Sequence, residues 1–198
     1  MKKRLKYFIL CIIIVVCCYL YSHVDKTHDI YNSEVDTGLY LAIALENGNS
    51  GSQLFKCQEE HLDGVSIKMS VNSVSMQGKL KYVLYDEKGK SLTSGELAIE
   101  EIKSGRINKI LFEKSIENTK NNSYIISFSP VELQDGEYIG IYYLQEKSSQ
   151  FIVGGKEVGG TMILRTVTHR FDVETFVVLI GFVIYFVLFF NILYKLFS

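Results

Sequence analysis

The chain has 198 residues, of which 47% are hydrophobic, with one proline, no tryptophan and a net charge of −1. The charge is uneven, because Lys2, Lys3, Arg4 and Lys6 precede any acid and residues 23–172 hold 16 basic against 21 acidic side chains. Such an acidic stretch lacks the basic footprint that nucleic-acid binding requires, so we expect no nucleic-acid partner. Its length suits one domain core and is too small for two.

The N-terminus is predicted to be a cytoplasmic basic tail, residues 1–6, followed by a transmembrane helix over residues 7–22. This stretch is apolar but near the lower length limit for a bilayer span. A cleaved signal peptide begins with the same basic and apolar pattern. Cleavage requires small residues at the exit, where this chain has Leu20 and Tyr21, so we favour an uncleaved signal anchor.

Residues 23–172 are dominated by hydrophobic residues that alternate with polar ones, which is the period of half-buried strands. Turn residues recur between about eight or nine such runs, as in an antiparallel sandwich. Residues 47–51 are a candidate hairpin turn between two of the runs. We therefore predict a mainly β, jelly-roll-like antiparallel β-sandwich. Its core face is expected on paired antiparallel strands, at Val65, Ile67, Met69, Leu80, Tyr82 and Leu84.

No arrangement of residues indicates catalysis. The glycine-rich stretch at residues 154–161 lacks the glycine-lysine-serine/threonine order of a phosphate loop and a helix to follow, which favours a hairpin loop. The acidic pairs at 59–60 and 100–101 would point to opposite faces of a strand, which separates their carboxylates. The four histidines show no metal-ligand spacing. We expect a non-enzymatic protein with no catalytic residue, no metal and no cofactor.

Residues 117–123 form an asparagine-rich loop before a predicted strand. An asparagine amide donates and accepts hydrogen bonds at once, which suits a sugar hydroxyl or a partner backbone. We single out as candidate binding residues Asn118, Asn121, Asn122 and Tyr124. The alternative is that this loop is merely a turn, and the glycine-rich loop at 154–160 has the same two interpretations.

An uncharged apolar run near the C-terminus predicts a second transmembrane helix over residues 175–195, with a cytoplasmic tail at 196–198. The basic residues before the first helix place the N-terminus in the cytoplasm under the positive-inside rule. Two spans then return the C-terminus to the same side. The expectation is a two-pass cell-membrane protein with both termini cytoplasmic and residues 23–172 outside the cell.

Strand patterning and turn residues recur in five stretches: Phe-Lys-Cys at 55–57, Leu-Asp-Gly-Val-Ser-Ile at 62–67, Gly-Lys-Leu-Lys-Tyr-Val-Leu at 78–84, the strand at 107–112 and Asn-Thr-Lys-Asn-Asn-Ser-Tyr at 118–124. This pattern resembles a jelly-roll module of bacterial envelope membrane proteins, often found beside or within glycosyltransferases and other surface-polysaccharide proteins. The resemblance implies a carbohydrate-binding-like sandwich and no enzyme. Here the module is flanked by two helices instead of a multi-spanning catalytic part.

These observations lead us to expect a membrane-anchored accessory or binding protein of the bacterial cell envelope. It would assist surface glycan assembly by binding glycan or an integral-membrane partner. The alternative is a structural subunit of a multi-component transporter or channel, in which the sandwich makes protein contacts only. An envelope hydrolase is the least favoured function, since it would require carboxylates from separate strands to meet in one groove.

Overall fold

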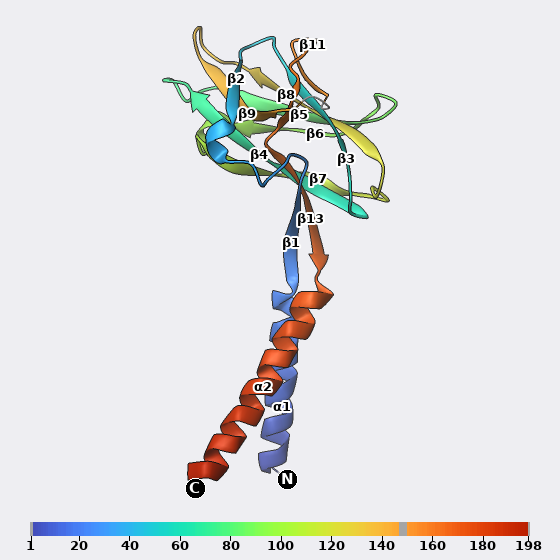
Figure 1. The fold of residues 1–198 in the computed structure, drawn as a ribbon, viewed down its shortest axis with the longest axis vertical. Coiled ribbons are helices and arrows are strands. Elements are labelled where there is room, and N and C mark those ends of the chain that lie inside the picture. The colour runs from blue at the N-terminus through green and yellow to red at the C-terminus, as the bar shows by residue number, and fades with distance from the viewer. Residues whose placement is uncertain (1, 147–149, 198) are drawn as a thin grey trace. The chain divides into compact units, whose positions relative to one another are not determined.

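The computed structural model describes residues 2–146 and 150–197, which divide into two compact units (Figure 1). The first, the helical unit, contains the described residues up to Lys26 and from His169 onward. The second, the β-sandwich unit, contains residues 27–168. The chain passes from one unit to the other within its first and last strands.

Two helices make up most of the helical unit, α1 (Lys2–Tyr21) and α2 (Val173–Phe197), and they contact each other. Among the described residues, only α2 is long and apolar enough to cross a membrane, with a mean hydropathy of 2.8. The apolar part described for α1, Ile9–Tyr21, is shorter. At about 1.5 Å per residue it covers roughly 20 Å of a hydrocarbon core about 30 Å thick. The predicted span at residues 175–195 is thus matched by α2, whereas the one at 7–22 falls short of the length required.

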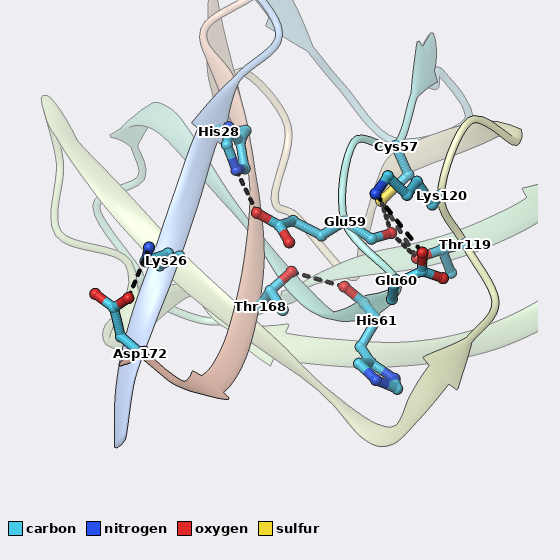
Figure 2. Close-up of polar contacts among 10 residues, drawn as sticks. All are labelled: Lys26, His28, Cys57, Glu59, Glu60, His61, Thr119, Lys120, Thr168 and Asp172. Atoms are coloured by element: carbon cyan, nitrogen blue, oxygen red, sulfur yellow. Dashed lines mark hydrogen bonds and ion pairs between the residues drawn. The ribbon is translucent and has the colours of Figure 1, made fainter. Parts of the chain in front are cut away.

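Asp172 links the start of α2 to the segment that follows α1. Its backbone N–H donates to Ser22 O at 2.8 Å, and its carboxylate accepts a hydrogen bond from Thr175 Oγ1 at 2.7 Å. Lys26 Nζ lies 3.1 Å from the other carboxylate oxygen (Figure 2). The hydrogen bond from Thr175 and the ion pair with Lys26 hold the pKa of Asp172 below its usual range. Its carboxylate also accepts a backbone hydrogen bond from Glu174, and Phe176 N–H donates to Asp172 O at 3.0 Å, so Asp172 acts as the N-cap of α2.

Two antiparallel sheets form the sandwich. Within the described residues, one has seven strands, in the order β1-β13-β4-β9-β12, with β2 added beside β9 and β7 beside β4. The other has six strands, in the order β11-β10-β3-β8-β5-β6. The bounds are β1 (His23–Asp29), β2 (Leu41–Leu45), β3 (Gly51–Lys56), β4 (His61–Asn72), β5 (Lys79–Asp86), β6 (Ser91–Ala98), β7 (Arg106–Glu117), β8 (Ser123–Val131), β9 (Tyr138–Gln145), β10 (Phe151–Val153), β11 (Lys156–Glu157), β12 (Gly160–Met162) and β13 (Leu164–Phe171), with short 3-10 helices at η1 (Thr37–Leu39) and η2 (Ile99–Glu101).

The mainly β, sandwich-like prediction is confirmed, and the predicted core residues are all buried. None of them is more than 5% exposed: Val65, Ile67, Met69, Leu80, Tyr82 and Leu84. The predicted pairing is wrong in one respect, because these two runs lie in different sheets. β4 pairs with β7, β9 and β13, whereas β5 pairs with β6 and β8. Both runs belong to one hydrophobic cluster, so they meet through their side chains and not through their backbones.

The two predicted hairpin turns have different outcomes. Gly154 and Gly155 join β10 to β11, and both have positive φ (55° and 78°), as a two-residue turn of the primed type requires. Residues 47–51 do not close a hairpin, because β2 pairs with β9 in one sheet and β3 pairs with β8 and β10 in the other. This segment carries the chain between the sheets, with Asn47 Nδ2 donating to Leu133 O at 2.6 Å.

Candidate binding groove

The predicted binding loop, residues 117–123, is a compact turn that hydrogen-bonds to the segment after β3. Asn121 N–H donates to Cys57 O at 2.8 Å, and Cys57 N–H donates to Asn122 O at 2.9 Å. Asn118 and Asn121 have positive φ (57° and 64°), a conformation that asparagine tolerates better than most residues. The loop is therefore held in one shape by its backbone.

Two buried side chains lock this contact. Thr119 Oγ1 donates to Glu59 O at 2.6 Å, and the Cys57 thiol lies 3.4 Å from Thr119 Oγ1 and 3.6 Å from Glu59 O. Figure 2 shows the three groups converging from the two segments. At the surface, Lys120 Nζ lies 3.8 Å from Glu60 Oε1. A buried hydroxyl and thiol with hydrogen-bond partners stabilise the turn without an unsatisfied polar atom.

The four predicted site residues do not share one surface. Asn118, Asn121 and Asn122 are exposed, and Asn122 Nδ2 donates to Asn118 O at 2.8 Å. Tyr124 is only 6% exposed and packs against Phe55, with ring centroids 6.1 Å apart. Burial raises the pKa of Tyr124. The tyrosine ring belongs to the core, because alternate residues of β8 face inward, while the role of the asparagines stays a prediction.

A polar groove of about 450 Å³ lies in the β-sandwich unit and receives residues from both sheets. His28, which lines it, places ring Nε2 2.7 Å from Oε1 of Glu59, the residue held by the predicted loop (Figure 2). The volume lies within the range of about 300–1,000 Å³ that small-molecule sites occupy. The groove therefore adjoins the segment that positions the asparagine loop.

The floor of the groove is polar and internally hydrogen-bonded. Gln53 is buried on β3, where its Oε1 accepts from Met162 N–H at 3.0 Å and its Nε2 donates to Leu54 O at 2.8 Å. Thr161 Oγ1 donates to Glu146 Oε2 at 2.7 Å. These hydrogen bonds fix the orientation of the Gln53 amide and the Glu146 carboxylate, which preorganises this part of the groove for a polar ligand.

The rim carries side chains that solvent reaches. Lys56, Gln58 and Gln150 are exposed and line the groove, beside the half-buried Asp29. An amide offers two donors and one acceptor, a lysine offers donors only, and a carboxylate offers acceptors only. The combined surface can bind a ligand that has many donors and acceptors of its own, such as a polyhydroxylated molecule.

Sequence reasoning missed this groove. Its residues come from β1, β3, β12, β13 and the segments that follow β1, β3 and β9, and no local motif links them. One signal was present in β3, where Gln53 occupies an inward-facing position between Gly51 and Phe55. A buried amide at a core position requires polar partners, and here those partners lie beside the groove. Within residues 2–146 and 150–197, no group of three or more histidine, cysteine, aspartate or glutamate side chains could hold a metal ion.

Comparisons with known proteins do not assign the chain to a family. No protein-family model and no curated protein matches the chain. Among solved structures, a structure of infectious bursal disease virus Gx strain is similar at 13% sequence identity and a TM-score of 0.28. The similarity covers 73% of this chain and 39% of that chain.

Proposed function

We propose that this chain is a non-enzymatic, membrane-anchored accessory protein of the bacterial cell envelope that binds glycan through the polar groove. The observation that carries the proposal is the gathering of side-chain amides, a carboxylate and an ammonium group in one groove, among them Gln58, Gln150, Glu146 and Lys56. Sugar hydroxyls donate and accept hydrogen bonds at once, so a surface with both capacities complements them. The resemblance of the five stretches between residues 55 and 124 to a jelly-roll module points to the same ligand class.

The anchoring part of the proposal concerns topology. The apolar side chains of α2 are exposed along its length, which suits contact with lipid. The basic residues that precede α1 favour a cytoplasmic N-terminus. We propose that α1 is an uncleaved signal anchor that enters the membrane beside α2, so that both termini are cytoplasmic and the sandwich lies outside the cell.

A second candidate function is a structural subunit of a multi-component transporter or channel. It is favoured by a row of aromatic rings on α2, in which Tyr185 stacks on Phe189 with centroids 6.0 Å apart and Phe186 on Phe190 with centroids 6.4 Å apart. Rings in a row present a continuous packing surface to another membrane helix. In this case the sandwich makes protein contacts only, and the groove has no sugar ligand.

The deciding experiment measures glycan binding by the full chain in mild detergent, on an array of bacterial surface oligosaccharides. The test variant combines Gln58→Ala and Gln150→Ala, which are exposed and lie on the groove rim. The matched control combines Gln77→Ala and Gln134→Ala, two exposed amides outside the groove. We expect the test variant to lose binding and the control to keep it, with unchanged melting temperatures. No binding by the wild-type chain, with a transporter or channel co-purifying in fixed ratio, would support the second candidate.

A further inference from the structure

A second hollow, of about 500 Å³, lies on the β-sandwich unit and shares no lining residue with the polar groove. Its walls come from the segment between β1 and β2, from β4, from the start of β7 and from the junction of β12 and β13. Of the described side chains that line it, three are cationic, Lys68, Arg106 and Arg165, and none is acidic. We call this site the basic hollow.

The positive charge of the basic hollow stands out against an acidic domain, since residues 23–172 have more acidic than basic side chains. Arg165 forms an ion pair with Asp29 and donates from Nη2 to the Tyr31 hydroxyl at 3.2 Å. Among the described residues, no carboxylate forms an ion pair with Lys68 or Arg106. Two cations without an internal counter-charge therefore face one cavity.

Lys68 is held in place by two aromatic rings. Its Nζ lies 5.1 Å from the centroid of Tyr40 and 4.9 Å from that of Tyr142, within the range of a cation–π contact. Tyr40 in turn packs edge-on against Tyr31, with centroids 6.0 Å apart. A lysine ordered in this way loses less side-chain entropy when an anion binds to it, so the affinity for the anion is higher.

The remaining walls fit a sugar ring. Ser33 and Thr37 are exposed and supply hydroxyl groups, and Ile107 is 40% exposed and supplies an apolar surface. Sugar rings present hydroxyls at their edge and C–H groups on their face, so a site for them combines these two kinds of surface. An inorganic anion has no apolar surface that could pack against Ile107.

We propose that the basic hollow binds an acidic sugar unit of a glycan, whose carboxylate lies near Lys68 and Arg106 and whose hydroxyls meet Ser33 and Thr37. The inference rests on the proposed glycan-binding function and adds a second subsite with a required ligand charge. A chain with both sites would bind an acidic polysaccharide at two points and a neutral one at the polar groove alone.

The test compares two ligands for the full chain in mild detergent, by calorimetric titration. One ligand is a tetrasaccharide of alternating glucuronate and N-acetylglucosamine, and the other is the same tetrasaccharide with its carboxylates reduced to alcohols. We expect the acidic form to bind about tenfold more tightly, as a charge-assisted hydrogen bond predicts, and to lose this advantage between about 50 mM and about 500 mM NaCl. Equal affinity for the two ligands would overturn the inference while leaving glycan binding intact.

Two variants locate the effect. Lys68→Met keeps the aliphatic stem against the tyrosine rings and removes the charge, and Arg106→Gln removes the charge of an exposed side chain. Each should remove most of the preference for the acidic ligand, whereas Lys88→Gln, at an exposed position in the β5–β6 turn, should keep it. A preference that survives in both test variants would rule out the basic hollow. Binding of inorganic phosphate that competes with neither tetrasaccharide would also count against a sugar site.

Discussion

Ser75 binds both carboxylate oxygens of Glu137. Its backbone N–H donates to Oε1 at 2.9 Å and its hydroxyl donates to Oε2 at 3.1 Å. Ser73 Oγ and the Val74 N–H also donate to Oε1, and Gln134 N–H donates to Oε2. These donors, led by the Ser75 amide, lower the pKa of Glu137 to about 2. The carboxylate thereby joins the β4–β5 connection to the turn before β9.

This geometry predicts a loss of stability in acid. A depressed pKa contributes stability that is complete above the ordinary carboxyl pKa and disappears as pH falls toward about 2. The melting temperature of the wild-type chain should therefore drop between about pH 5 and about pH 2. Glu137→Gln should melt lower at neutral pH and show a flatter acid dependence. Glu100→Gln, which alters an exposed residue of η2, is the control, and parallel curves for all three proteins would contradict the assignment.

Core packing predicts a large cost for truncating β4. Ile67 is fully buried, so Ile67→Ala should lower the free energy of unfolding by about 2–5 kcal/mol through lost burial and the cavity left behind. Ile152→Ala makes the same change on β10, where the side chain is 41% exposed, and should cost much less. Urea unfolding followed by circular dichroism measures both. Equal costs for the two variants would mean that β4 does not face the core.

The two-pass topology predicts labelling from outside the cell. Val74 is 97% exposed, so a cysteine there can react freely, whereas the native Cys57 is fully buried. With Cys11, Cys17 and Cys18 replaced by serine, Val74→Cys should react with a membrane-impermeant maleimide on intact cells. The parent without the Val74 change should stay unlabelled. Reaction only after lysis would place the sandwich in the cytoplasm.

Substitutions in the asparagine loop must be compatible with its backbone conformation. Asn118 and Asn121 have positive φ, so glycine replaces them without strain, whereas alanine would strain the turn. Asn118→Gly and Asn121→Gly, combined with Asn122→Ala, should weaken glycan or partner binding and leave the melting temperature nearly unchanged. Asn72→Ala, at the exposed end of β4, is the control. If the triple variant binds as tightly as wild type while folded, the loop is only a turn.

Much of the secondary structure could be predicted because the hydrophobic positions of the alternating runs are buried, most regularly in β3, β5 and β8. Val65, Ile67 and Met69 alternate with polar neighbours, and the structure buries all three. The same alternation in β8 should have placed Tyr124 inside, since it shares its face with Ile126. Its ring contributes to the core, and a ligand contact by Tyr124 stays a prediction.

Strand pairing and the two cavities could not be predicted from the sequence. Residues 47–51 have the composition of a hairpin turn, yet the flanking strands find better partners far along the chain, in β8 and β9. Likewise, the contact between His28 and Glu59 spans 31 residues. Local patterns report which residues are buried, whereas the choice of neighbour depends on how all the strands together fill the core.

The sheet order has a practical consequence for engineering. β1 and β13, which begin and end the sandwich, are neighbours in the seven-stranded sheet. A domain whose entry and exit strands are adjacent can be closed by a short linker and reopened elsewhere. The turn between β5 and β6, with exposed Lys88 and Gly89, offers a place for new termini. Such a circular permutant would separate the β module from its helices and make it portable to other scaffolds.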